Sequence, residues 1–267
     1  MPKVLILTEL SQGAADLLLT DCMVSALKRA IPTTTPTQVT AVNRLQLSGI
    51  VDNASQDEQV ICALTLNLPD TLTLPAHATY QACKDVAGLR QLLMEKFDIA
   101  SADGCFWLPV VLTAKGPLYG EVIALQKRKV RSEFSSDRNF VRERKVQAEV
   151  SSDWNFVREG LLEDSPLSIK SFYQPHYFPD AIRQKLYHLG YCLMRLLAAP
   201  PATYLVQFAV RESVIYFDRL WPFPAAPAIA SIGVQEPDLF MCHWCCLSGQ
   251  AVLDLTIMST VTGQTST

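Results

Sequence analysis

The sequence predicts an α+β fold in which a small α/β lobe precedes a larger part that carries antiparallel strands. Near the start, the compact apolar run Lys3–Thr8 is followed by an amphipathic segment, residues 14–30, as in a βα unit. Further along, two extended apolar runs at residues 203–210 and 214–217 flank the polar turn 211–213. Such a pattern predicts a β-hairpin.

The composition limits the classes of partner. Of the 267 residues, 49% are hydrophobic, which is enough to bury a core of ordinary size, and the formal net charge is −3. This weak charge gives no electrostatic reason to bind nucleic acid or an anionic membrane. No apolar run approaches the roughly 20 residues of a membrane span, and the eight cysteines are scattered as buried thiols usually are. We therefore expect a cytoplasmic protein that binds neither nucleic acid nor membrane.

Residues 1–75 are expected to form the small lobe. Lys3–Thr8 is apolar throughout, as in strands buried on both faces of a parallel sheet. The turn at residues 11–13 holds one glycine, too few for a dinucleotide-binding loop. The expected buried stripe of the helix is Leu17, Leu18, Cys22, Val24, Leu27 and Ala30. Further short strands are expected at residues 39–42, 50–51 and 60–64.

The larger part begins with an amphipathic helix over residues 79–97. Its expected buried stripe is Val86, Leu89, Leu92, Leu93 and Phe97. The next stretch has the sequence LPVVLTAKGPLYGEVIAL over residues 108–125, and it predicts a strand at 109–112, a glycine-containing turn and a strand at 121–125. A second amphipathic helix, over residues 178–197, then leads through a proline-rich stop into the hairpin.

A tandem duplication lies between these parts. Residues 128–143 and 144–159 share RKV, SSD and NFVRE. Two copies are too few for a solenoid, which stacks at least about three repeats. The basic and acidic side chains of the region nearly cancel, which is typical of a solvated face. We expect one copy to be looped out of its domain or appended to it.

The order of these segments resembles the ATP-grasp ligases, most of all the branch of carbamoyl-phosphate synthetase and biotin carboxylase. The resemblance covers roughly residues 79–233. It rests on KDVAGLRQLL, LPVVLTAKGPLYGEV, NFVREGLLEDSPLSI and VQFAV followed by the proline-rich exit. It implies a two-lobe clamp around ATP at residues 76–233, preceded by a small α/β (Rossmann-like) lobe at 1–75. The segment 234–267 would be a tail outside the resemblance.

The resemblance also implies nucleotide-binding residues. Thr113 stands where the family has a phosphate-binding lysine, and the period of a strand would put Lys115 on the same side. The alternative is a solvated turn lysine. The family's linker acid matches Glu159, for which a strand that ends in an acidic turn is the alternative. The full set of implied nucleotide contacts is Lys115, Gly116, Gly120, Glu159, Leu161, Leu162 and Glu163.

Metal binding by the hairpin is the least complete part of the resemblance. Gln207 matches a metal-side glutamine. The family's next ligands, a Glu and an Asn, and its Arg correspond here to Arg219, Trp221 and Phe223, none of which ligates Mg²⁺. Asp218 stands one residue early, on the other strand face unless a β-bulge intervenes. The candidate metal ligands are therefore Gln207 and Asp218.

The function implied is ATP-dependent ligation with ATP and Mg²⁺ as cofactors. In the family, a carboxylate is phosphorylated to an acyl-phosphate that an amine or another nucleophile attacks. The incomplete metal set predicts an impaired enzyme, and a non-catalytic scaffold or regulatory relative is the alternative. A third hypothesis is a zinc-stabilised interaction protein built on Cys242, His243, Cys245 and Cys246.

Overall fold

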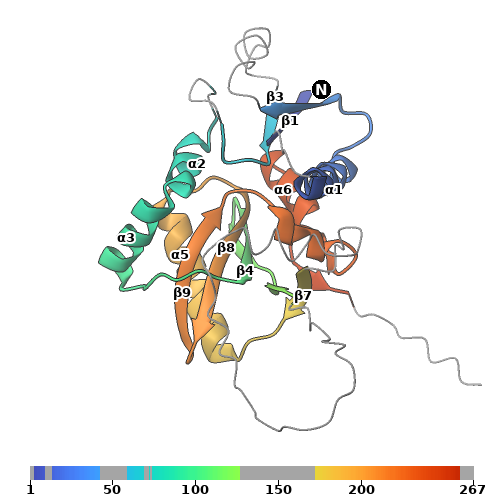
Figure 1. Cartoon of the computed structure of the whole chain (residues 1–267). Coiled ribbons are helices and arrows are strands. Elements are labelled where there is room, and N and C mark those ends of the chain that lie inside the picture. The colour runs from blue at the N-terminus through green and yellow to red at the C-terminus, as the bar shows by residue number, and fades with distance from the viewer. Residues whose placement is uncertain are drawn as a thin grey trace, which may run out of the picture.

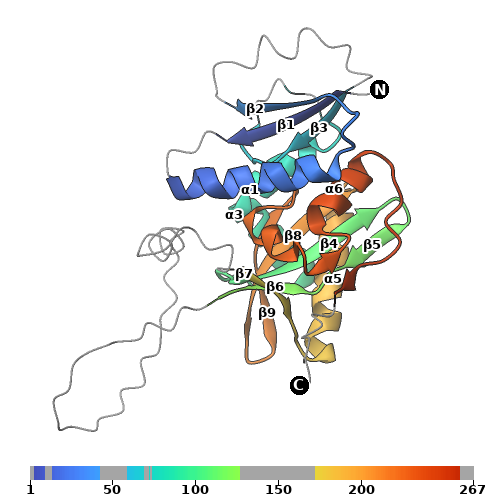
Figure 2. The same cartoon turned by 90° about the vertical axis from the view of Figure 1, so that its right-hand side faces the viewer.

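Two sheets of different type organise the molecule, for which the computed structural model describes residues 3–9, 14–42, 59–68, 72, 74–126 and 172–258. The smaller sheet is parallel and the larger is antiparallel, so the α+β class is as predicted (Figure 1). Helix α1 (Ala14–Ala30) packs between the small sheet and α6 (Leu239–Leu247), as Figure 2 shows. The duplication at residues 128–159 lies outside the described residues.

The small sheet has the strand order β2-β1-β3, and all its pairs are parallel. Its strands are β1 (Lys3–Glu9), β2 (Thr37–Val42) and β3 (Gln59–Ala63). In β1, the side chains of Val4 to Leu7 are at most 1% exposed. The prediction of a strand buried on both faces is confirmed, as are the strands near 39–42 and 60–64. The strand expected at residues 50–51 lies outside the described residues.

Helix α1 has the predicted bounds but a different buried stripe. Leu17 and Leu18 are 48% and 49% exposed, so their place in the stripe was wrong. The buried residues of α1 are Met23, Ala26, Leu27 and Ala30. They share one helical face in the C-terminal half of α1, the half through which the helix packs onto the core.

The single helix expected at residues 79–97 is two helices, α2 (His77–Lys84) and α3 (Val86–Phe97). The break falls at Asp85, whose carboxylate accepts a hydrogen bond from the Gly88 backbone N–H at 2.9 Å. An aspartate at this position caps a new helix because it satisfies an unpaired N–H of the first turn. Leu89 and Leu93 are buried as predicted, whereas Phe97 is 37% exposed.

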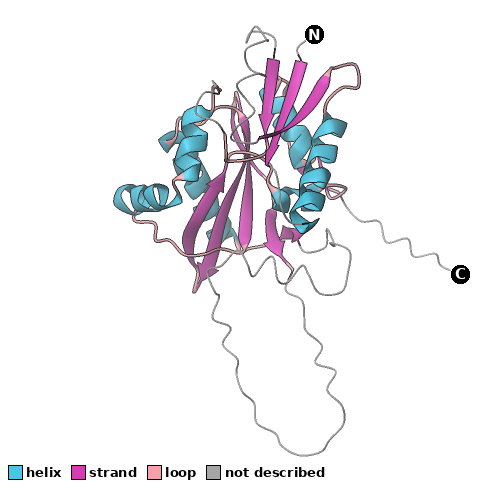
Figure 3. Ribbon diagram, turned by 45° about the horizontal axis from the view of Figure 1, so that its top comes forward, coloured by secondary structure: helices cyan, strands magenta, loops and turns pink. Residues whose placement is uncertain are grey.

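The large sheet has the strand order β7-β6-β4-β8-β9, with β5 paired to β4. All these pairs are antiparallel. The strands are β4 (Phe106–Thr113), β5 (Gly116–Tyr119), β6 (Val122–Leu125), β7 (Phe172–His176), β8 (Ala202–Arg211) and β9 (Val214–Trp221). Helix α5 (Asp180–Leu196) packs on one face of the sheet and α6 on the other. Figure 3 shows helices on both sides of the large sheet.

The predicted hairpin is β8–β9, and it turns at Glu212 and Ser213, both of which have a positive φ. Strand β9 ends at Trp221, directly before Pro222, as the missing ladder donors of the prolines predict. Beyond the hairpin lie a 3₁₀ helix, η4 (Ala226–Ser231), and a short two-stranded sheet of β10 (Gln235–Glu236) and β11 (Thr256–Ile257).

The segment after Gly233 is part of the core. Leu239 and Phe240 of α6 are fully buried, and α6 packs against α1, β4 and β8. The expectation of a tail beyond residue 233 is therefore wrong for residues 234–258. Among the described residues, no helix is both long and apolar enough to cross a membrane.

Candidate functional site

The two predicted metal ligands are brought together by neighbouring strands. Gln207 lies on β8 and pairs with Arg219, while the next residue of β8, Phe208, pairs with Phe217. Asp218 is therefore an extra residue on β9, and it forms a β-bulge. A bulge re-aims a side chain, and the Asp218 side chain is only 4% exposed. The sequence analysis placed Asp218 on the opposite strand face from a ligand unless a β-bulge intervened, and the structure contains this bulge.

The Gln207 and Asp218 side chains both form hydrogen bonds with the backbone of one glycine, Gly104. The Gln207 Nε2 donates to the Gly104 carbonyl at 2.7 Å, and the Gly104 N–H donates to Asp218 Oδ2 at 2.8 Å. A Cβ at Gly104 would lie 2.3 Å from backbone atoms of Phe208. Only glycine fits such a close approach of two backbones, so this contact requires Gly104.

The Asp218 carboxylate is also paired with arginine. The Arg90 Nη2, from α3, lies 2.6 Å from Asp218 Oδ1, and Arg90 Nε donates to the Asp218 carbonyl at 2.9 Å. Arg219 Nε reaches the same Oδ1 at 3.4 Å. Arg90 further pairs with the more exposed Asp103 at 3.3 Å. Two guanidinium groups and two carboxylates thus balance their charges around the loop that leads into β4.

The positions that the resemblance aligns with metal-site residues are used here for packing and hydrogen bonding. Arg219 stands at the Glu position and contacts Asp218. Trp221 stands at the Asn position, and its Nε1 donates to Gln207 Oε1 at 3.2 Å. Phe223 stands at the Arg position, is 3% exposed, and lies beside Tyr80 with ring centroids 6.1 Å apart.

This donor set does not fit Mg²⁺. The ion requires oxygen ligands near octahedral geometry, but both Asp218 oxygens already accept from protein donors, and both polar atoms of the Gln207 amide are hydrogen-bonded. The Arg90 guanidinium lies beside Oδ1, where a cation would bind. Among the described residues, no group of three or more His, Cys, Asp or Glu side chains is placed to hold a metal.

The predicted phosphate-binding residues lie in a tight hairpin. Strands β4 and β5 pair directly, with Thr113 opposite Gly116, so Lys115 is in the two-residue turn between them. The Thr113 hydroxyl donates to the Gly116 carbonyl at 2.8 Å and accepts from the Lys115 N–H at 3.1 Å. Gly116 has a φ of +127°, which an L side chain rarely adopts. Gly120 is buried, and its N–H donates to the Pro109 carbonyl at 3.0 Å.

Gln207, Asp218, Gly104 and Arg90 form one hydrogen-bonded group, here called the Gln207–Asp218 cluster. The hairpin turn at Lys115 lies far from this cluster. Gln207 pairs with Trp107, near the start of β4, whereas Lys115 follows the end of β4 at Thr113. Six residues of strand separate these points by about 20 Å, more than a lysine side chain can bridge. The strand period that would put Lys115 on the side of Thr113 does not continue through a turn. Lys115 and Gln207 therefore do not converge on one site.

The two hairpins also share one sheet. Residues 106–112 of β4 pair with residues 202–208 of β8 along seven consecutive positions. Because hydrogen-bonded strands lie about 4.8 Å apart, no slot can lie between them. In the two-lobe clamp that the resemblance implies, these two hairpins therefore cannot be the opposite walls of an ATP site.

Several sequence-based proposals concern residues outside the described ranges. They include the glycine of the first turn, at residue 13, and the nucleotide contacts Glu159, Leu161, Leu162 and Glu163.

The four residues of the zinc hypothesis are described, and they lie on α6. Cys242, His243 and Cys246 are buried, and Cys245 is partly buried. Burial raises the pKa of the Cys246 thiol to about 11, and these four side chains are not among any described group placed to hold a metal ion.

Sequence reasoning missed Arg90 and Gly104, which complete the cluster. Arg90 was part of an amphipathic helix pattern, in which an arginine normally faces solvent. Gly104 follows Asp103, and an Asp-Gly pair is a turn signal. That signal locates a turn but not the strand backbone it approaches, because the contact with Phe208 spans about one hundred residues of sequence.

Comparisons with known proteins identify fold relatives. No protein-family model matches the chain, and no curated protein matches it significantly. The solved glycinamide-RNase-transformylase T of Mycobacterium tuberculosis covers 96% of this chain and 82% of its own, with a TM-score of 0.61 at 12% identity. N5-carboxyaminoimidazole ribonucleotide synthetase of Thermotoga maritima covers 96% and 78%, with a TM-score of 0.60 at 9% identity.

A third solved structure holds a nucleotide. The N5-carboxyaminoimidazole synthase of Aspergillus clavatus, in a complex with ADP, covers 94% of this chain and 78% of its own. Its TM-score is 0.51 at 11% identity. Identities this low establish a common fold alone.

Proposed function

The described chain has an ATP-grasp fold, and on that premise we propose that it is an ATP-binding protein of the carboxylate–amine or carboxylate–thiol ligase class with an impaired catalytic step. Nucleotide binding is supported by fold relatives solved with ADP and with ATP. The partner would be a small-molecule nucleotide, with neither nucleic acid nor membrane. We also propose a cytoplasmic location, because the eight free cysteines are mostly buried, as reduced thiols are.

One observation carries the proposed impairment: the guanidinium of Arg90 lies 2.6 Å from the carboxylate of Asp218. A divalent cation bound to the same oxygen would be repelled by this charge and would have to displace it. In metal-assisted phosphoryl transfer, the cation neutralises charge that develops on the phosphates. A site that holds an arginine in its place lacks this source of rate acceleration.

The proposed nucleotide contacts are Lys115, Gly116, Gly120, Glu159, Leu161, Leu162 and Glu163. Lys115 is exposed at the β4–β5 turn, so its ammonium group is accessible to an anionic ligand. Because Lys115 lies far from Gln207, the phosphates bound near the turn would not be held by the Gln207–Asp218 cluster. This separation also supports binding without efficient chemistry.

Thermal unfolding with ATP in EDTA and with ATP plus Mg²⁺ tests this proposal. ATP at ten times its dissociation constant stabilises a binding protein by about 1.4 kcal/mol, which corresponds to a Tm rise of roughly 3–6 °C for a chain of this size. We expect the same rise in EDTA and in Mg²⁺, because no metal site contributes. A coupled assay for ADP release, with a carboxylate and an amine present, is expected to give no turnover.

Tripolyphosphate at the same concentration and ionic strength is the control for non-specific anion binding. A rise with ATP that tripolyphosphate does not reproduce supports a nucleotide site. A rise that appears only with Mg²⁺, together with steady ADP release, would contradict the impairment and identify an active ligase.

A non-catalytic scaffold is the second candidate. The observation that favours it is the direct pairing of β4 with β8, which leaves no gap between the two hairpins. In that case, the described sheets would serve as a packing unit or a regulatory surface. Absence of any ATP-dependent Tm rise at millimolar ATP would support the scaffold and reject the nucleotide-binding proposal.

A further inference from the structure

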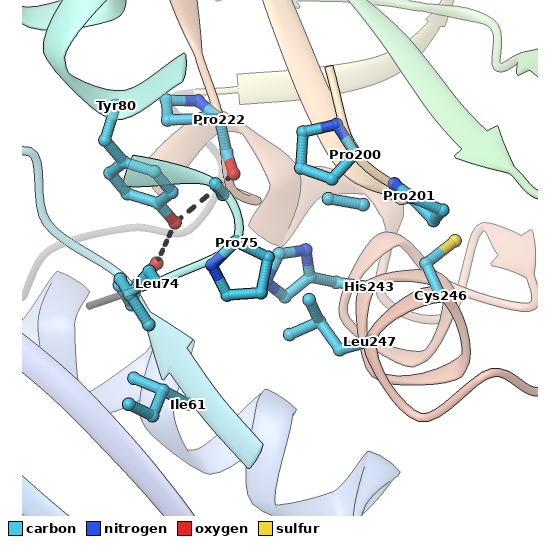
Figure 4. A pocket seen from close by; sticks show the side chains of 13 residues that line it. Ile61, Leu74, Pro75, Tyr80, Pro200, Pro201, Pro222, His243, Cys246 and Leu247 are labelled. Atoms are coloured by element: carbon cyan, nitrogen blue, oxygen red, sulfur yellow. Dashed lines mark hydrogen bonds between the residues drawn. The ribbon is translucent and has the colours of Figure 1, made fainter. Parts of the chain in front are cut away.

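A cavity lies where the small sheet, α2 and α6 meet. Its volume is about 220 Å³. Figure 4 shows side chains from these separate parts of the chain around one space, among them Ile61 of β3, Leu74 before α2, and His243 and Leu247 of α6. The cavity is distinct from the Gln207–Asp218 cluster, since no residue of that cluster lines it.

The walls of the cavity are apolar and stiff. Four prolines line it, namely Pro75, Pro200, Pro201 and Pro222. Proline has a fixed φ and no N–H, so these walls hold their shape and offer no backbone donor. None of the described lining residues carries a charge at neutral pH. A charged ligand would lose its hydration here without a compensating partner, whereas an uncharged apolar ligand would lose little.

The second observation is the hydrogen-bonding state of His243. Its Nδ1 accepts a hydrogen bond from the Thr203 backbone N–H at 3.2 Å. Because a neutral imidazole carries one hydrogen, that hydrogen is then on Nε2. Nε2 is buried and has no hydrogen-bond partner, and the residue is 1% exposed. Burial lowers the pKa of His243 to about 3, so the ring is neutral at physiological pH.

The hydroxyl group at the wall is already engaged. The Tyr80 hydroxyl donates to the Ala63 carbonyl at 2.9 Å and lies 3.4 Å from the Pro222 carbonyl (Figure 4). Of the side-chain N–H and O–H donors in the lining, the His243 Nε2–H is thus the one without a partner, beside the weakly donating thiol of Cys246. A buried donor without a partner costs about 1–3 kcal/mol, and a ligand that accepts this hydrogen recovers that free energy.

We propose that this cavity binds a small, uncharged and mainly apolar molecule that carries one hydrogen-bond acceptor, such as a ketone or ester carbonyl. The apolar part fills the space between the prolines, and the acceptor takes the hydrogen of His243 Nε2. An engineered cavity of about 150 Å³ binds benzene, so about 220 Å³ can hold a substituted ring. Water does not reach Nε2, so binding includes a small side-chain movement that uncovers it.

Two probes of similar shape test the site, acetophenone and isopropylbenzene. Acetophenone has a carbonyl where isopropylbenzene has a CH–CH₃ unit. Titration calorimetry on the full chain, without nucleotide, measures both affinities. We expect the wild type to bind acetophenone roughly tenfold more tightly than isopropylbenzene, the factor of one hydrogen bond.

The variant His243→Met isolates the hydrogen bond. The Met thioether accepts hydrogen bonds weakly and donates none, so no side-chain donor remains at this position, and a native circular dichroism spectrum verifies that the fold is retained. We expect this variant to bind isopropylbenzene more tightly than acetophenone, because the carbonyl then loses its hydration without a donor in return. Ala63→Leu fills the cavity, and it is expected to abolish binding of both probes while the circular dichroism spectrum stays native.

Three outcomes would overturn the proposal. They are absence of binding by the wild type, equal binding of the two probes by the wild type, and binding that survives Ala63→Leu in a folded protein. Because no nucleotide is present, each result is independent of the test of ATP binding.

Discussion

At Asp218, where the resemblance implies a metal ligand, a single carboxylate forms a structural junction. It joins α3 through Arg90, the loop before β4 through Gly104, and β9 through its own bulge. Gln207 does the same from β8, since its amide bonds Gly104 and Trp221. Polar groups buried in this way are worth more to the fold than exposed ones, because each is costly to leave unpaired.

Asp218→Asn is expected to lower the free energy of unfolding by about 2–3 kcal/mol, because it leaves Arg90 without its buried partner. Asp103→Asn is the matched control. Asp103 pairs with the same arginine, but its side chain is 38% exposed, so we expect a loss below about 1 kcal/mol. Urea unfolding measures both values. Equal losses for the two variants would show that the Asp218 pair is not a structural junction.

At the scale of elements, hydrogen bonds determine which secondary structure a sequence pattern forms. The stretch Leu108–Leu125 resembles a phosphate-binding strand and loop, and in the structure β5 pairs with β4 and closes the loop into a hairpin. The glycines then serve the hairpin, Gly116 through its positive φ and Gly120 through its bond to Pro109. Asp85 acts in the same way when it divides one amphipathic pattern into two helices.

Thr113→Val removes both hydrogen bonds of the turn hydroxyl, and we expect a loss of about 1 kcal/mol in the free energy of unfolding. Lys115→Ala keeps the turn, because only the backbone of Lys115 takes part in it, and the change should stay within about 0.5 kcal/mol. Under the proposed function, Lys115→Ala also reduces the ATP-dependent Tm rise. If the ATP-dependent Tm rise of this stable variant equals that of the wild type, Lys115 does not contact the nucleotide.

At the scale of the whole molecule, α6 joins the two sheets. It packs on α1, which covers the small sheet, and on β4 and β8 of the large sheet. Helix α6 lies beyond residues 79–233, the range of the family resemblance, and yet it completes the core. The cavity beside His243 exists because this helix brings its side chains to the end of β3.

Phe240→Ala is therefore expected to lower the free energy of unfolding by about 3–5 kcal/mol, the cost of a large cavity in a packed core. Leu253→Ala is the control from the same segment. Leu253 is 79% exposed, and its loss should cost less than about 0.5 kcal/mol. Chemical denaturation of both variants provides the test. A small effect of Phe240→Ala would mean that α6 is dispensable for the core.

The sequence by itself determined the elements that have a local signature. The apolar run of β1, the length of α1 and the β8–β9 hairpin follow from periodicity and from turn and proline chemistry, all of which act within a few residues. The resemblance to a known fold followed from the order of such elements. Gln207 and Asp218 were named together as candidate metal ligands by that resemblance.

Only the tertiary structure decided which elements pair and what the residues then do. Trp107 meets Gln207 across one hundred residues, and no local pattern specifies such a partner. The roles of Gly104, Arg90 and Lys115 all depend on that pairing, since it fixes which backbone approaches the glycine and how far the turn lies from the cluster. The physical reason is that a strand shows which of its faces is buried, but not which strand will satisfy its hydrogen bonds.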